Sequence, residues 1–132
     1  MLDKIFNWFS FCFGAIGGIL ASLLGGIDEI LIALLLLCVF DFISGIIKSI
    51  ITKKLSSEVG FKGILKKVGI FIVVAISCIL QTKIFGGIPL REVTIFFYIA
   101  NEGISILENL SEIVDIPQKV KDVLYQLRNN KK

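Results

Sequence analysis

Long apolar blocks separated by short charged connections make up most of the chain. Four such blocks, at 5–27, 30–47, 68–82 and 93–110, carry few charges or none. A helix needs about 20 residues to cross a hydrocarbon core that is about 30 Å thick. The pattern therefore predicts an all-α, polytopic helical membrane protein with three or four transmembrane helices.

The third block is short for a crossing, because it contains only about 15 residues. Lys66, Lys67 and Lys83 flank this block. Long lysine side chains can reach outward to the membrane interface and so lengthen a span. We expect these three lysines to point away from the hydrocarbon and to extend the block.

The distribution of lysines predicts the orientation in the membrane. Six lysines crowd the connection 48–67, where Glu58 is the only acidic residue, whereas the first connection holds Asp28 and Glu29. Loops rich in Lys and Arg stay in the cytoplasm. We therefore expect a cytoplasmic 48–67 loop. Four spans place both termini inside, and three require one terminal block to lie on the membrane.

The same pattern divides the chain into two parts. Residues 1–116 are predicted to form the helical membrane domain. Residues 117–132 begin with a proline, contain several basic residues and have apolar side chains at helical spacing. They are predicted to form a basic cytoplasmic tail with a short amphipathic helix.

The composition excludes several functional classes. The chain has no histidine, and no glycine-rich phosphate loop precedes a Lys-Ser/Thr pair. Its three cysteines lie within apolar blocks, which is typical of small apolar side chains. Basic cytoplasmic loops account for the net charge of +3. We therefore expect a protein that is not an enzyme, with no cofactor, metal ion or nucleic-acid partner.

Small residues recur every four positions along the first block, at Gly14, Gly18, Ser22 and Gly26. Such a ladder lets two helix backbones approach closely in lipid. We interpret these four residues as a helix-packing face. The contact can form within one chain or between chains.

Asp41 lies on one helix face with Ser44, Gly45 and Lys48. A carboxylate within hydrocarbon must pair, protonate or meet water. Two roles remain open for Asp41. Either it bonds a neighbouring helix and stabilises the fold, or it lines a polar path.

The fourth block is amphipathic. At about 100° per residue its polar side chains fall within an arc of roughly 120°. These are Tyr98, Asn101, Glu102, Ser105, Glu108, Asn109 and Glu112. Helices that lie in the interface usually carry Lys and Arg, and this one is acidic.

Polar rings of this kind line pores. We therefore expect the arc from Tyr98 to Asn109, with Asp41, to line a pore or contact another subunit; an interfacial helix is the alternative. Glu102 falls near the middle of the block. It either meets water in an assembly or bonds within its own bundle.

Small and polar residues also follow one another in a characteristic order. The order runs through Asp41, Gly45, Lys48, Ser56, Ser57, Gly60, Gly63, Lys66 and Lys67, then the stretch Asn101–Asn109, then Pro117 before a lysine-containing helix. In this respect the chain resembles the small phage-lysis and toxin-secretion holins of Gram-positive bacteria and their phages. The resemblance covers most of the chain, from about Leu34 to Leu127.

The resemblance implies a self-assembling pore former, a multi-pass protein of the bacterial cytoplasmic membrane that releases a wall-degrading endolysin or a large toxin. Its implied partners are further copies of itself and the lipid bilayer, with an antiholin as a further candidate. Two other functions fit the same residues. One is an antiholin or other membrane regulator of a pore former, and the other is an accessory membrane transport subunit.

Overall fold

Residues 1–129, which the computed structural model describes, form five helices. They are α1 (Leu2–Leu23), α2 (Glu29–Ile51), α3 (Ser57–Lys83), α4 (Leu90–Leu110) and α5 (Gln118–Asn129). Within this part of the chain, α1, α2 and α3 are long and apolar enough to cross a membrane. The prediction of an all-α, multi-pass protein is confirmed.

The third helix is longer than its apolar block. It contains 27 residues and begins at Ser57, because the Ser56 hydroxyl accepts a hydrogen bond from the amide of Val59 at 3.2 Å and caps the helix. Its length is therefore sufficient for a crossing without help from flanking lysines. The fourth block forms α4, which is less apolar and does not qualify as a candidate span by the same criteria.

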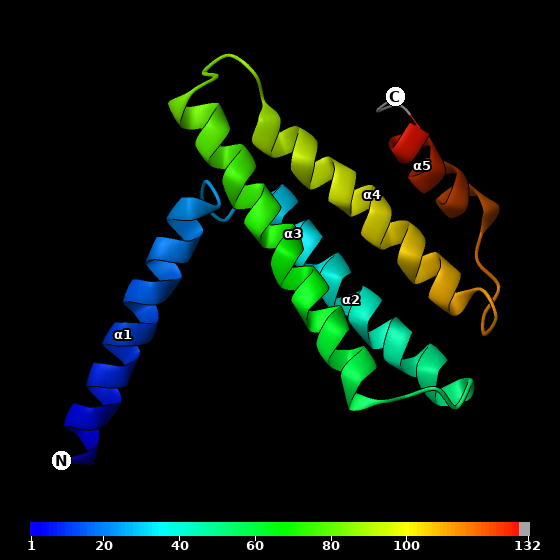
Figure 1. The fold of residues 1–132 in the computed structure, drawn as a ribbon, viewed down its shortest axis with the longest axis horizontal. Helices are drawn as coiled ribbons and strands as arrows, with labels where there is room; N and C mark the ends of the chain where they lie inside the picture. The colour runs from blue at the N-terminus through cyan, green and yellow to red at the C-terminus, as the bar shows by residue number, and fades with distance from the viewer. Residues whose placement is uncertain (130–132) are drawn as a thin grey trace.

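Helices α2, α3 and α4 pack together into a bundle (Figure 1). Its apolar centre contains Leu34, Cys38, Val74 and Ile95. Leu34, Val74 and Ile95 are among the most deeply buried side chains. The three helices are thus held together by apolar side chains, which lie on the same helix faces as the polar residues described in the next subsection.

Helix α1 leaves this bundle (Figure 1) and contains no buried residue over its full length, all of which the structure describes. It ends at Leu23, earlier than the apolar block, because Gly25 and Gly26 take left-handed backbone with φ of 82° and 94°. Gly26 therefore lies in the turn and not on the helix. Among residues 1–129, nothing lies within 4 Å of a Cβ built on Gly14 or Gly18.

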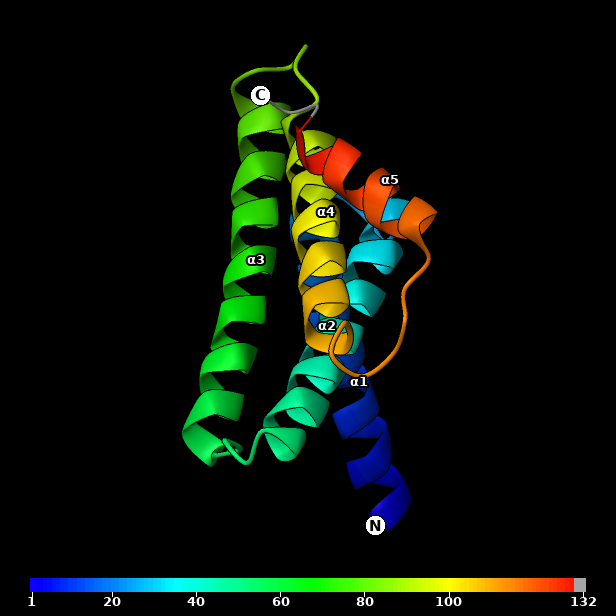
Figure 2. The ribbon, with the colours of Figure 1, turned by 90° about the vertical axis from the view of Figure 1, so that its right-hand side faces the viewer.

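Helix α5 follows Pro117, as predicted, and folds back along α4 (Figures 1 and 2). Leu124 packs against Gly103, where an added Cβ would lie 2.8 Å from the Leu124 Cδ2 atom. Gly103 therefore allows the close approach of the two helices. Lys131 and Lys132, at the end of the predicted basic tail, lie outside the described residues.

Candidate functional site

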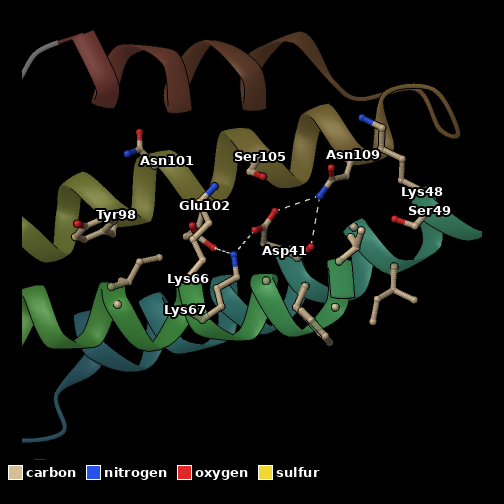
Figure 3. A pocket seen from close by; sticks show the side chains of 18 of the residues that line it. Asp41, Lys48, Ser49, Lys66, Lys67, Tyr98, Asn101, Glu102, Ser105 and Asn109 are labelled. Atoms are coloured by element: carbon tan, nitrogen blue, oxygen red, sulfur yellow. Dashed lines mark hydrogen bonds and ion pairs between the residues drawn. The ribbon is translucent and has the colours of Figure 1, made fainter. Parts of the chain in front are cut away.

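A cluster of three charged side chains joins the helices of the bundle (Figure 3). The Lys67 ammonium on α3 forms ion pairs with Asp41 Oδ2 on α2 and with Glu102 Oε2 on α4, the latter at 2.5 Å. The three side chains are only 17%, 12% and 10% exposed, respectively. Each carboxylate is therefore paired with a cation inside the molecule, as the low-dielectric surroundings require.

Asn109 extends this cluster toward the C-terminal end of α4. Its side-chain amide donates to Asp41 Oδ1 at 3.2 Å and to the Ser44 hydroxyl at 3.0 Å. Ser44 in turn donates to the Asp41 carbonyl at 3.0 Å. Both carboxylate oxygens of Asp41 therefore have partners on other helices of the single chain, Lys67 on α3 and Asn109 on α4.

Helical spacing explains why these residues meet. Glu102 and Asn109 are seven residues, or about two turns, apart and so lie on one face of α4. Gly45 lies opposite Asn109, where an added Cβ would be 3.6 Å from the Asn109 Nδ2 atom. A small residue on α2 thus lets the amide of Asn109 lie against that helix.

A cavity of about 730 Å³ lies beside the cluster, between α2, α3 and α4 (Figure 3). Its lining includes six of the seven residues predicted to line a pore or contact a subunit: Asp41, Tyr98, Asn101, Glu102, Ser105 and Asn109. Glu108, the seventh, is exposed and is not part of this lining within the described chain. Most of the polar arc of α4 therefore faces its own bundle in the single chain, and Glu108 does not.

The expectation for Lys67 was wrong. It does not reach outward to the interface but points inward to two carboxylates, because the bundle needs a cation at this depth. The sequence held one signal for this. Lys66 and Lys67 are adjacent, and neighbouring residues of a helix point about 100° apart, so both could not face outward from a helix packed as α3 is.

A second polar site, missed by the sequence analysis, lies at the opposite end of α4. Arg91 is only 4% exposed and holds the carboxylate of Asp28 in a two-pronged contact, with Nη1–Oδ2 at 2.9 Å and Nη2–Oδ1 at 3.0 Å. It also donates to the carbonyl oxygens of Leu24 at 2.5 Å and Gly26 at 3.1 Å. These contacts, which we call the Arg91 clamp, attach the α1–α2 turn to α4.

Groups on α3 and in the α1–α2 turn lie close around the Arg91 clamp. The Arg91 backbone amide donates to the Gln81 side chain of α3 at 2.7 Å. A Cβ added at Gly25 would lie 2.5 Å from Arg91 Nε. The hydrogen bond from Arg91 is the main cause that holds the pKa of Asp28 below its ordinary value. The sequence signal that could have identified this site is Arg91 itself, an arginine two residues after Pro89 and far from the basic connection 48–67.

A comparison with protein families identifies the family of this chain. The model of the bacteriophage holin family matches residues 18–129. The chain belongs to the bacteriophage holin family. Holins are membrane proteins without enzymatic activity, so the expectation of a non-enzyme is confirmed. Most of α1 precedes the matched region.

Individual relatives of this holin-family chain come from Gram-positive bacteria and a phage. It is 37% identical to a "Probable holin" of Bacillus phage phi105, over 74% of this chain and 73% of that protein. It is 44% identical to protein Lmo0128 of Listeria monocytogenes, over 84% and 77%, respectively. A Clostridium perfringens protein of 14.9 kDa is 36% identical over 98% of this chain and its own entire length. No solved structure matches the chain.

Proposed function

We propose that this chain is a holin that oligomerises in the cytoplasmic membrane and opens a lesion through which an endolysin or a large toxin leaves the cell. The main support is the charged cluster of Asp41, Lys67 and Glu102, which joins α4 to α2 and α3, two helices apolar enough to span a bilayer. A charge in hydrocarbon costs a few kcal/mol even on insertion scales. Such groups persist where they pair or meet water.

The proposed mechanism has two states that both satisfy these charges. In the single chain Lys67 pairs with both carboxylates and the polar arc of α4 faces inward. In the assembly the same polar faces of several copies line a shared water-filled path. The apolar faces of the helices contact lipid in both states, so the transition exchanges pairing within a chain for contact with water.

The test is to express the chain in a bacterium together with a cytoplasmic endolysin, and to follow membrane potential and endolysin release. We expect growth to stop abruptly, the potential to collapse and the endolysin to leave the cell. Intact potential and viability at high levels of membrane-inserted protein would contradict pore formation. The chain would then be a regulator, such as an antiholin.

Substitutions of Glu102 test the role of the polar arc. We expect Glu102→Gln to insert normally but to change the time of lysis, and Glu102→Leu to abolish opening, because water no longer meets a polar group there. Glu58→Gln is the control, since Glu58 is exposed and lies outside the polar arc. If both Glu102 variants instead lower the amount of inserted protein, Glu102 acts only within its own bundle.

We also propose that the α2–α3 connection, with the adjoining ends of both helices, and the C-terminus are cytoplasmic. The basis is the excess of basic residues in 48–67. Lys54→Cys, in a chain whose own cysteines are replaced by alanine, gives a single thiol in the loop. We expect no reaction with a membrane-impermeant reagent in intact cells and full reaction after the membrane is opened. Labelling in intact cells would reverse the orientation.

A further inference from the structure

The cavity beside the charged cluster contains two lysines that the cluster does not use. Lys67 is paired with Asp41 and Glu102, whereas Lys48 and Lys66 also line the cavity and have no ion-pair partner within residues 1–129. Lys48 lies toward the C-terminal end of α4 and Lys66 nearer its middle (Figure 3). Three lysines face two carboxylates, so the lining has a surplus of positive charge.

The rest of the lining combines polar and apolar surface. The hydroxyls of Ser49 and Ser105 and the amide of Asn101 supply neutral hydrogen-bonding groups. The apolar wall comes from α2, α3 and the connection between them, and it includes Phe42, Ile46, Leu55, Val59, Ile70 and Val73. Both helices are candidate membrane spans, so the part of this wall that Phe42, Ile46, Ile70 and Val73 form lies where lipid is present.

Glycines on α3 keep the cavity open. Gly60 and Gly69 both line it, and nothing in the described chain lies within 4 Å of a Cβ built on either. A Cβ at either position would therefore have open space around it.

We propose that the cavity binds an anionic phospholipid, whose charged headgroup is attracted by Lys48 and Lys66 and one of whose acyl chains lies along the apolar wall. Charge complementarity favours this occupant, because unpaired lysines between membrane helices attract anionic headgroups. A free phosphate ion would use the amines but not the apolar wall. The inference goes beyond the proposed function, since it concerns the single chain and does not require a pore.

The test uses the purified full chain in detergent micelles and native mass spectrometry. The probes are dioleoyl phosphatidylglycerol, which is anionic, and dioleoyl phosphatidylcholine, which is zwitterionic. We expect phosphatidylglycerol to bind at roughly tenfold lower concentration, because the lysines attract its negative charge. The double variant Lys48→Gln/Lys66→Gln should lose this preference. Lys54→Gln/Lys62→Gln, which changes the charge equally outside the cavity, should retain it.

A second variant tests the cavity without changing its charge. Gly60→Leu should fill the space and weaken phosphatidylglycerol binding while the helical circular dichroism stays unchanged. Gly86→Leu, in the α3–α4 connection, is its control and should bind as the native chain does. Equal binding of the two lipids, or an equal loss of phosphatidylglycerol binding in a variant and its control, would overturn the proposal. So would displacement of bound phosphatidylglycerol by soluble glycerol 3-phosphate as effectively as by another lipid.

Discussion

Helix α1 and the α2–α3–α4 bundle differ in how their side chains are packed and paired. Helix α1 is apolar, has no buried residue and makes little contact with the other helices (Figure 1). The bundle is held by an apolar centre and by charged and amide side chains that pair across helices. Polar pairs determine which helices of the bundle contact one another. The apolar surface of α1, with its small residues, does not determine which surface it contacts.

The largest effect is expected from breaking the charged cluster. Lys67→Met should destabilise the bundle by about 3–5 kcal/mol, because it leaves two buried carboxylates without their cation. Thermal unfolding in micelles and the amount of inserted protein would measure this. Lys62→Met is the control and should have little effect, since Lys62 is exposed and outside the cavity.

A rescue variant distinguishes lost pairing from lost packing. The triple variant Lys67→Met/Asp41→Asn/Glu102→Gln removes all three charges together and should recover most of the lost stability. Failure of the triple variant to improve on Lys67→Met would show that the cluster is held by shape and not by charge.

A smaller effect is expected at the Arg91 clamp. Arg91→Gln should loosen the α1–α2 turn and cost about 1–3 kcal/mol, because the Asp28 carboxylate and two turn carbonyls lose a common donor. Faster proteolysis between α1 and α2 would report the change. Lys83→Gln, an exposed position at the end of α3, should cleave at the native rate.

Acid should release the clamp in a defined direction. The hydrogen bond from Arg91 lowers the pKa of Asp28 below its ordinary value of 3.8, so the contact is fully present above pH 3.8 and is lost as pH falls through the lowered value. Protection of the α1–α2 turn from an acid-active protease should therefore decrease only below that pH. An Asp28→Asn chain that shows the same decrease would assign it to another group.

The smallest effect on the single chain is expected in α1. Gly18→Leu should change the stability of the monomer by no more than about 0.5 kcal/mol, since Gly18 has open space around it. If the ladder of Gly14, Gly18 and Ser22 is a contact between chains, the same variant should weaken cross-linked oligomers and shift the time of lysis. Unchanged cross-linking would show that this face meets lipid.

Local patterns were sufficient to predict the helices but not their partners. Hydropathy predicted an all-α chain, and the helical periodicity of the fourth block grouped Glu102 with Asn109. Which way Lys67 points depends on carboxylates contributed by α2 and α4, so it is decided by packing across long sequence distances. The Arg91 clamp joins positions 63 residues apart, and no local pattern encodes that distance.

The distance spanned by the Arg91 clamp also orders the synthesis of the molecule. The ribosome completes the turn after α1, with Asp28 and the carbonyls of Leu24 and Gly26, long before it reaches Arg91. The early turn thus waits for a late side chain, and a nascent chain interrupted before residue 91 lacks the group that attaches α1 to the rest. Docking of the turn after the first helix therefore follows the synthesis of Arg91 on α4.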